Sequence, residues 1–194
     1  APAPGRLLVY VGGFSPHKNL LGLLEALAAV LGRPGMDDVR LVLVGDHLTD
    51  AFHSCYREAV ERAARPPLAG RVEFAGYLPD PQLVEVLNQA TALVLPSFLE
   101  GFGLPAIEAA ACGLPVIATT ASPLPELLGA GGWFVDPHDR AALENALSGV
   151  LSDPDLRRRL RDEGRRAVQA LTWDRAARDL VAVFDRLAPH AQAA

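Results

Sequence analysis

Two glutamates eight positions apart stand on either side of a glycine-rich turn. Glu100 opens the stretch Glu-Gly-Phe-Gly-Leu-Pro-Ala-Ile-Glu and Glu108 closes it. An apolar run at 92–95 precedes the turn, and an Ala-rich helical pattern that begins at Leu104 follows it. Glycines let backbone amides approach a ligand closely, and the first turn of a helix attracts anions. Carboxylates beside such an anion site suit a ligand that carries neutral hydroxyls around a phosphate centre.

A single lysine supports the same chemistry. Lys18 is the one lysine among the 18 Lys and Arg residues, and it lies in the loop Gly-Gly-Phe-Ser-Pro-His-Lys-Asn after the apolar run 7–11. A compact ammonium on a flexible stem suits a diphosphate at a strand end. A solvated lysine near a helix start is the alternative interpretation. Together with the two glutamates, the loop favours a nucleotide-sugar, which has hydroxyls at both ends and phosphates between them.

Composition limits the classes of function. The 194 residues are half hydrophobic, enough for one domain with a sizeable core. A net charge of −5 argues against nucleic-acid binding. Cys55 and Cys112 lie far apart, as is typical of free thiols in a reducing compartment rather than of a disulfide or a metal site. No apolar run is long enough to cross a membrane and no secretion signal is found, so we expect a cytoplasmic protein.

Apolar runs alternate with helical patterns almost to the end of the chain. The expected strands are 7–11, 40–44, 72–75, 92–95, 115–118 and 133–135. The expected helices are 19–31, 51–64, 80–89, one that begins at 104, 123–128 and 140–151. The strand runs lack polar alternation, as in strands that are covered on both faces. We therefore predict an α/β fold: a doubly wound, Rossmann-like parallel sheet of about six strands with helices on both faces.

Ligands of such sheets bind beyond the carboxyl ends of the strands. Four turns fall at that edge, namely Gly12-Gly13, Gly45-Asp46, Gly76-Tyr77 and 97–103. Their coincidence predicts one crevice.

The chain ends differently, with two charged helices expected at 153–171 and 173–187 and a C-terminal helical segment that spans 153–190. The first helix carries a basic run of Arg157, Arg158, Arg159, Arg161, Arg165 and Arg166. The acidic residues within that run favour a solvated helix face, and weak attraction to a membrane surface is the alternative. We interpret Asp153-Pro154-Asp155 as a helix cap rather than a metal motif.

These motifs together resemble the C-terminal, donor-binding domain of retaining glycosyltransferases of the GT-B fold, family 4. The resemblance rests on Glu-x7-Glu at 100–108, the Gly-Gly…Lys-Asn loop, and the segments 111–118, 124–126, 135–137 and 172–174. It covers nearly the whole chain, which we expect to form a single nucleotide-sugar-binding domain over 1–194 with linker-like residues at 1–5. It also implies that the N-terminal acceptor domain of the same enzyme is missing from this chain, so that the fragment alone is inactive.

The resemblance assigns roles residue by residue. Lys18 would contact the donor diphosphate, Glu100 the transferred sugar near the reacting centre, and Glu108 the ribose hydroxyls, with Lys18 and Glu100 as the catalytic pair. The amides of 101–103 would support the sugar and phosphates, and the segment 74–77 would lie beside the nucleobase. The remaining donor-binding residues are Gly12, Gly13, Phe74, Gly76, Tyr77, Gly101, Phe102, Gly103 and Leu104.

One position departs from the family pattern. Many relatives carry an arginine directly after the first loop glycine, where this chain has Gly13, so diphosphate binding depends more on Lys18 and on helix amides. The implied reaction is a metal-independent transfer of a hexose, with retained configuration, from a UDP or GDP sugar to a glycan or lipid-linked acceptor. Neither a metal nor a cofactor is expected. The Lys-Asn loop and Leu-Pro-Glu favour mannose or a related donor, and the full-length enzyme would associate peripherally with the inner face of a membrane.

Other functions stay open at this point. A non-catalytic sugar-nucleotide binding module, or a partner subunit of a separate N-terminal chain, would carry the same residues. A GT-B epimerase or a glycan phosphorylase shares the fold, as does a flavodoxin-like or receiver domain. A receiver needs an acidic cluster after its first strand, where this chain has Gly12-Gly13.

Overall fold

The computed structural model describes residues 6–46 and 54–187. Six strands form one sheet in the order β3-β2-β1-β4-β5-β6, and all neighbouring strands pair in parallel. The strands are β1 (Leu7–Val11), β2 (Arg40–Val44), β3 (Val72–Gly76), β4 (Ala92–Leu95), β5 (Val116–Thr119) and β6 (Gly132–Val135). This order confirms the predicted doubly wound sheet, and every strand lies within one residue of its expected range.

The helices follow the strands as predicted. They are α1 (Leu20–Leu31), α2 (Tyr56–Ala63), α3 (Asp80–Gln89), α4 (Leu104–Ala111), α5 (Leu124–Leu128), α6 (Arg140–Ser152), α7 (Pro154–Val168) and α8 (Trp173–Leu187). Two short 3₁₀ turns occur at Pro16–Lys18 and Gly129–Gly131. The helix expected at 51–64 begins at Tyr56, with 51–53 outside the described residues, and α7 ends three residues before the expected 171.

The centre of the sheet is the most apolar part of the molecule. All four residues of β4 and of β5 are buried, as are the three middle residues of β1. Burial on both faces explains why these strands read as unbroken apolar runs. The edge strand β3 differs, because Glu73 is exposed and its neighbours are only half-buried.

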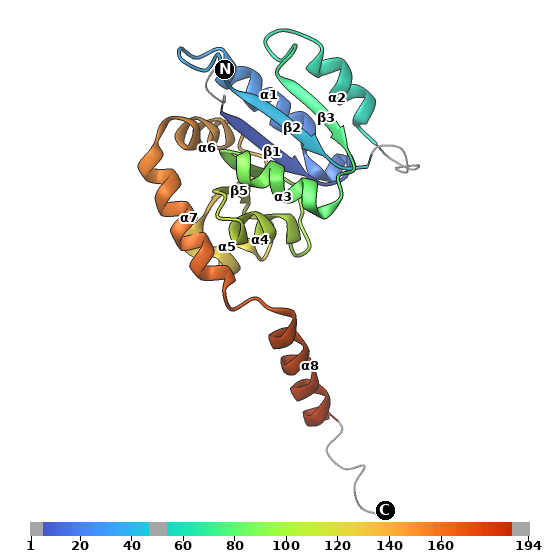
Figure 1. Cartoon of the computed structure of the whole chain (residues 1–194). Coiled ribbons are helices and arrows are strands. Elements are labelled where there is room, and N and C mark those ends of the chain that lie inside the picture. The colour runs from blue at the N-terminus through green and yellow to red at the C-terminus, as the bar shows by residue number, and fades with distance from the viewer. Residues whose placement is uncertain (1–5, 47–53, 188–194) are drawn as a thin grey trace, which may run out of the picture.

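Helices cover both faces of the sheet (Figure 1). Helix α1 packs against α2 and α6 on one face, and α7 packs on α4 and α5 on the other. Ion pairs join the first group: Glu25 of α1 pairs with Arg62 of α2 and with Arg140 of α6, and Arg33, just after α1, pairs with Glu144 of α6.

The two C-terminal helices have different surroundings. Helix α7 begins at a cap, as expected, because the Asp153 carboxylate accepts hydrogen bonds from the amides of Asp155 and Leu156 at 2.9 and 3.0 Å. The bond from Leu156 lowers the pKa of Asp153. Helix α8 projects away from the sheet and has no buried residue (Figure 1). None of the described helices combines the length and the apolar character needed to cross a membrane.

At the carboxyl edge of the sheet, the backbones of the turns that follow β1, β2 and β3 lie in close contact. The amide of Gly12 donates to Val44 and the amide of Gly45 donates to Gly76, both at 2.9 Å. A Cβ atom at Gly45 would lie 1.9 Å from the carbonyl oxygen of Gly12. The turn after β2 therefore needs glycine to stay against the turn after β1.

We expect Gly45→Ala to lower the free energy of unfolding by roughly 3 kcal/mol, because the clash is with backbone that cannot rotate away. For a chain of this size the melting temperature would fall by about 6–12 °C. Thermal unfolding followed by circular dichroism measures it. Gly32→Ala is the matched control, since its Cβ would lie 3.5 Å from the nearest atom. Equal melting temperatures for both variants would contradict the close approach.

Candidate functional site

The strand order places a crevice between β1 and β4. From β1 the chain continues to β2 on one side of the sheet, whereas from β4 it continues to β5 on the other. The loops that follow β1 and β4 therefore diverge at their carboxyl ends, which is where open α/β sheets bind ligands. Lys18 lies in the first of these loops and Glu100 in the second.

Lys18 and Glu100 meet across this crevice. Lys18 Nζ donates to Glu100 Oε2 at 2.8 Å, although the residues are 82 positions apart in sequence. The Lys18 side chain is 20 % exposed and that of Glu100 is 11 % exposed. The pair is therefore mostly removed from water, and each charge neutralises the other in the absence of a ligand.

The loop after β1 holds Lys18 through the residue that follows it. Asn19 adopts a left-handed conformation (φ 55°, ψ 34°), which ends the 3₁₀ turn Pro16–Lys18 and starts α1. Its side-chain amide donates to the carbonyl of Pro96 at 3.0 Å and to that of Pro137 at 3.1 Å. Asn19 is 8 % exposed and thus ties together the loops after β1, β4 and β6.

The loop after β4 is fixed as tightly. Ser97 is fully buried, and its hydroxyl donates to Glu100 Oε2 at 3.1 Å. The amide of Glu100 donates to Ala121 in the loop after β5, and the amide of Phe98 donates to His17 beside Lys18. The Glu100 carboxylate is therefore oriented by Ser97 as well as by Lys18.

The glycine turn after Glu100 leaves backbone donors available. Gly103 adopts a left-handed conformation (φ 79°) at the N-terminus of α4, and Pro105 occupies its first turn, as the sequence indicated. Across residues 6–46 and 54–187, no protein acceptor lies within hydrogen-bond distance of the amides of Gly101, Phe102 and Gly103. These amides and the helix N-terminus can accommodate an anion.

Glu108 lies one turn into α4, on an open groove of about 540 Å³ between α4 and the start of α8. Phe102 and Leu104 line the same groove, so it borders the glycine turn. Partial burial, and then the nearby Asp80 carboxylate, raise the pKa of Glu108 above its ordinary value of 4.5. No contact joins Glu108 to Glu100 in the described structure.

The end of β3 contributes one half-buried and one exposed aromatic residue. The Phe74 ring stacks on Phe14 at 6.2 Å and meets Tyr56 edge-on at 5.4 Å, so it is part of a packed aromatic cluster. Tyr77 is 72 % exposed and follows Gly76, which has a positive φ of 70°. Of the expected nucleobase segment, Tyr77 is the aromatic side chain presented to solvent.

The sequence analysis assigned no role to three residues that shape the site. Asn19 and Ser97 fix the two loops, and the His138 ring stacks on Phe98 at 5.0 Å. A polar residue two positions after a wholly apolar strand was the signal for Ser97. Nothing in the sequence spacing indicated that the loop after β6 would reach Phe98.

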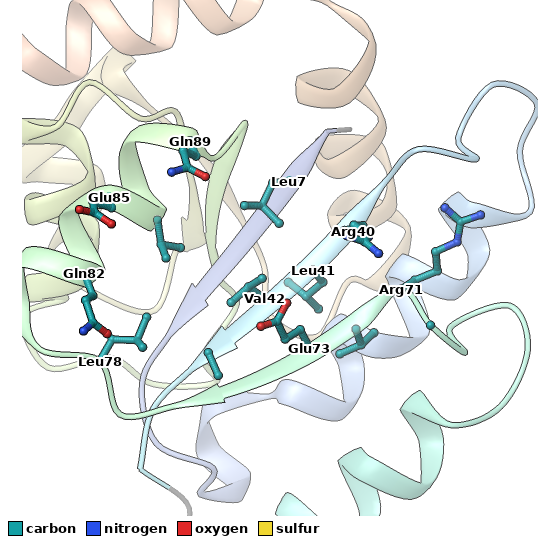
Figure 2. Close-up of a pocket in the computed structure, with 14 residues that line it drawn as sticks. Leu7, Arg40, Leu41, Val42, Arg71, Glu73, Leu78, Gln82, Glu85 and Gln89 are labelled. Carbon is teal, nitrogen blue, oxygen red and sulfur yellow. The ribbon is translucent and has the colours of Figure 1, made fainter. Parts of the chain in front are cut away.

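A further cavity lies away from Lys18 and Glu100. It measures about 680 Å³ and lies between α3 and the partly covered face of β1–β3, with Leu7, Val42 and Glu73 on one side and Gln82 and Glu85 on the other (Figure 2). Of the predicted nucleobase segment 74–77, Ala75 lines it. It exists because β3 is an edge strand whose exposed face is only partly covered by α3.

Metal-ligating residues do not gather in the described part of the chain, where no three His, Cys, Asp or Glu residues come together. Cys55 is buried and Cys112 is half-buried, and no disulfide joins them. His47, His53 and His190 lie outside the described residues.

The Lys18–Glu100 pair can be measured with a double-mutant cycle. Lys18→Met leaves a mostly buried carboxylate without its cation, whereas Lys18→Met combined with Glu100→Gln removes both charges. We expect a coupling free energy of roughly 1–2 kcal/mol in urea unfolding, between the values typical of exposed and of buried pairs. Additive effects of the two single substitutions would show that the contact contributes nothing to stability.

The raised pKa of Glu108 makes stability depend on pH. A carboxyl whose folded-state pKa lies above its unfolded value contributes stability below about pH 4.5, and that contribution is lost as the pH rises through the raised pKa. We therefore expect Glu108→Gln to raise the melting temperature by about 1 °C at pH 7 and to change it little at pH 4.

Nuclear magnetic resonance titration of Glu108 identifies the cause of the shift. Asp80→Asn should move its pKa toward the ordinary value, whereas Glu85→Gln on the same helix α3 should leave it in place. An unshifted Glu108 in the unmodified chain would contradict the burial of this carboxyl.

The amino-acid sequence of this chain matches one known protein family and its members. The family described as "Glycosyl transferases group 1" matches residues 2–167. The O-antigen chain mannosyltransferase B of Escherichia coli is 32 % identical over 166 residues, which is 86 % of this chain and 42 % of that enzyme. The chain therefore spans less than half the length of this curated relative.

Solved structures agree with this coverage. Sucrose-phosphate synthase from Thermosynechococcus elongatus is 34 % identical with a TM-score of 0.83, and the match covers 96 % of this chain and 46 % of that one. The C-terminal domain of a glycosyl transferase group 1 family protein from Francisella tularensis matches over 86 % of both chains, at 26 % identity and a TM-score of 0.73. Anabaena HepE in complex with UDP and glucose is 25 % identical, with a TM-score of 0.79, and covers 95 % of this chain and 49 % of that one.

Proposed function

Because this chain belongs to the glycosyl transferases group 1 family, we propose that it is the donor-binding domain of a retaining glycosyltransferase. It binds a nucleotide-diphosphate sugar in the crevice between the loops after β1 and β4. The whole enzyme transfers a hexose from that donor to a glycan or lipid-linked acceptor. UDP and GDP sugars are the donor candidates, and the similarity to a mannosyltransferase favours a mannose-type sugar.

The contact between Lys18 and Glu100 carries this proposal. A nucleotide-sugar offers a diphosphate for the lysine and sugar hydroxyls for the glutamate, so it replaces the partner of each at once. A diphosphate without a sugar would pair with Lys18 and separate it from Glu100. The Glu100 side chain is only 11 % exposed and would then have no cation beside it. Leaving a buried charge unpaired is costly, so the pair favours the complete donor over its phosphate portion alone.

The other residues extend the site along the donor. The amides of Gly101, Phe102 and Gly103 lie next to Glu100 and supply neutral donors for the sugar and phosphates. Glu108 faces the groove beyond Phe102 and Leu104, where it receives the ribose hydroxyls. Gly12 and Gly13 allow close approach at the end of β1, and Gly76 and Tyr77 form the wall beside the base.

In the transfer step these groups stabilise the departing diphosphate. Lys18 and the amides at the start of α4 would then be fixed donors for the negative charge that develops on the leaving group. Glu100 holds the transferred sugar while its bond to the diphosphate breaks. The proposed roles use side chains and amides alone and require no metal.

The acceptor site belongs to an N-terminal domain that this chain does not include. Helix α8 exposes an apolar stripe of Leu180, Val181, Phe184 and Leu187. We propose that this stripe packs on the N-terminal domain in the whole enzyme. Cys55 and Cys112 are not joined in a disulfide, which agrees with a reducing compartment, and we propose that the enzyme lies in the cytoplasm, at the inner face of the membrane when the acceptor is lipid-linked.

Calorimetric titration of the chain with UDP, GDP and their hexose conjugates tests the proposal. Lys18→Ala and Glu108→Ala should each weaken nucleoside diphosphate binding by about 10- to 100-fold, the effect of one charge-assisted hydrogen bond of about 1.5–3 kcal/mol. Glu100→Ala should bind the nucleoside diphosphate at least as tightly as before, because Lys18 no longer has a competing carboxylate, and should bind the sugar-bearing form more weakly.

Glu85→Ala is the matched control, since this carboxylate lines the cavity beside β3 and should affect neither ligand. Equal loss of both ligands in the Glu100 variant would remove the role given to that residue. Binding of every donor with unchanged affinity in the Lys18 variant would overturn the assignment of the crevice.

A further inference from the structure

A second polar pocket lies at the opposite edge of the sheet from the donor crevice. It measures about 550 Å³, and its lining includes Arg6 before β1, Thr91 before β4 and Pro115 before β5. All three positions are at the amino ends of strands, whereas Lys18 and Glu100 lie beyond the carboxyl ends. Helix α7 forms the remaining wall.

The pocket is lined by cations without carboxylates. Its described lining contains no Asp or Glu and has five arginines: Arg6, Arg157, Arg158, Arg161 and Arg165. The chain as a whole carries a net charge of −5, so this concentration of positive charge is opposite in sign to the rest of the molecule. A pocket of this size can hold a small ligand.

Helical spacing brings the arginines of α7 together. Arg157, Arg161 and Arg165 are four positions apart and therefore share one face of the helix. The sequence analysis interpreted the basic run as a solvated helix face, and all of its members except the half-buried Arg157 are exposed. Part of this solvated run also faces the amino edge of the sheet, and Arg159 and Arg166 are the two members that do not line the pocket.

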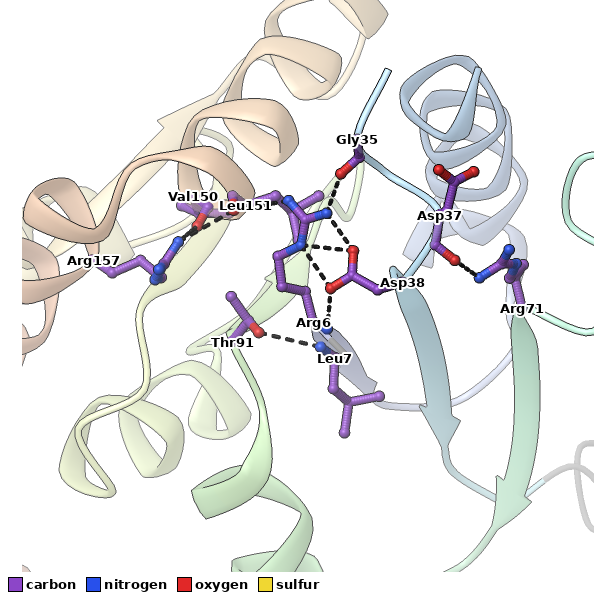
Figure 3. Close-up of polar contacts among 10 residues, drawn as sticks. All are labelled: Arg6, Leu7, Gly35, Asp37, Asp38, Arg71, Thr91, Val150, Leu151 and Arg157. Carbon is purple, nitrogen blue, oxygen red and sulfur yellow. Dashed lines mark hydrogen bonds and ion pairs between the residues drawn. The ribbon is translucent and has the colours of Figure 1, made fainter. Parts of the chain in front are cut away.

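Two of these guanidinium groups converge on a single oxygen. Arg6 Nη1 donates to the carbonyl of Leu151 at 3.2 Å, and Arg157 Nη1 donates to the same carbonyl at 3.3 Å (Figure 3). Like charges held this close repel each other, and an anion between them relieves the repulsion. Asp38 pairs with Arg6 from the outer side, as Figure 3 shows, and it is not part of the pocket lining.

The remaining contacts leave donor capacity in the pocket. Within the described residues, Arg157 and Arg165 have no carboxylate at ion-pair distance, and Arg165 donates only to the carbonyl of Cys112, at 3.3 Å. A guanidinium has five N–H donors, so most of them stay available. Arg161 makes one contact, at 3.5 Å, with the exposed Asp162 next to it in sequence.

We propose that this arginine pocket binds a phosphate-bearing anion. Arginine presents paired donors that match phosphate oxygens, and several converge here on one volume. The Thr91 hydroxyl, which accepts from the amide of Leu7 at 3.1 Å, adds a further donor. The ligand is either a soluble phosphate compound or the phosphate of an anionic lipid headgroup. The site is independent of the donor crevice.

Inorganic pyrophosphate is the first probe, titrated into the isotopically labelled chain in phosphate-free buffer, with Lys18→Ala titrated in parallel to separate any binding in the crevice. Saturable shifts are expected for the amides of Thr91, Cys112 and Gly113 and along α7. Arg161→Gln should weaken this binding roughly tenfold, the effect of one charge-assisted hydrogen bond. The melting temperature should change little, because within the described residues the guanidinium of Arg161 makes one polar contact, with the exposed Asp162.

Arg159→Gln is the matched control, since it removes the same charge from the same helix outside the pocket. It should leave pyrophosphate affinity unchanged. Equal loss in both variants would show general attraction to a basic helix and overturn the proposal. Shifts confined to residues 12–19 and 97–103, or no saturable shift, would overturn it as well.

Vesicle sedimentation separates the two sources of phosphate. Vesicles that contain phosphatidylglycerol should retain the chain when the ligand is a headgroup, with retention lost in Arg161→Gln, kept in Arg159→Gln and competed by pyrophosphate. Phosphatidylcholine vesicles should not retain it. Pyrophosphate binding without retention assigns the pocket to a soluble phosphate compound, and absence of both overturns the proposal.

Discussion

The side chain of Asn19 is the interaction on which the carboxyl edge of the sheet depends. Its amide nitrogen has two hydrogens, and each is donated to the carbonyl of a proline that follows a different strand, Pro96 after β4 and Pro137 after β6. A left-handed backbone at the same residue ends one turn and begins α1. Gly22 makes room for it, since a Cβ there would lie 2.3 Å from Asn19 Oδ1. One residue thus sets the separation of the loops that present Lys18 and Glu100.

Charge is organised differently at the two edges of the sheet. In the crevice, the positive charge of Lys18 and the negative charge of Glu100 lie in contact and cancel each other. At the amino edge, the arginines of the pocket donate to backbone carbonyl oxygens, which carry no net charge. Their positive charge is therefore not neutralised by these contacts. A parallel sheet makes such a separation natural, because all strand ends of one kind lie on the same side.

The strands were predictable because their signals are local. Unbroken apolar runs predicted β1, β4 and β5 to within one residue. Parallel topology predicted that the loops of Lys18 and Glu100 share one edge of the sheet, whereas their direct contact was not predicted. The bridging role of Asn19, the burial of Ser97 and the direction of the α7 arginines depend on how distant segments pack, and a spacing pattern carries no such information. The ring contacts of Phe74 with Phe14 and Tyr56 likewise join segments that are distant in sequence, and no spacing pattern predicted them.

Helix α8 sets the limit of what this domain can fold by itself. Its 15 residues have no buried member, and an isolated helix of that length is only marginally stable in water. The cooperative unit that unfolds as a whole therefore ends with α7, whose Leu160, Gly164 and Val168 are buried. Amide hydrogens in β1 and β4 would exchange only through global unfolding, whereas those of α8 would exchange through local fraying. Whether α8 is stably folded therefore depends on the protein surface that packs against it and does not depend on the sheet.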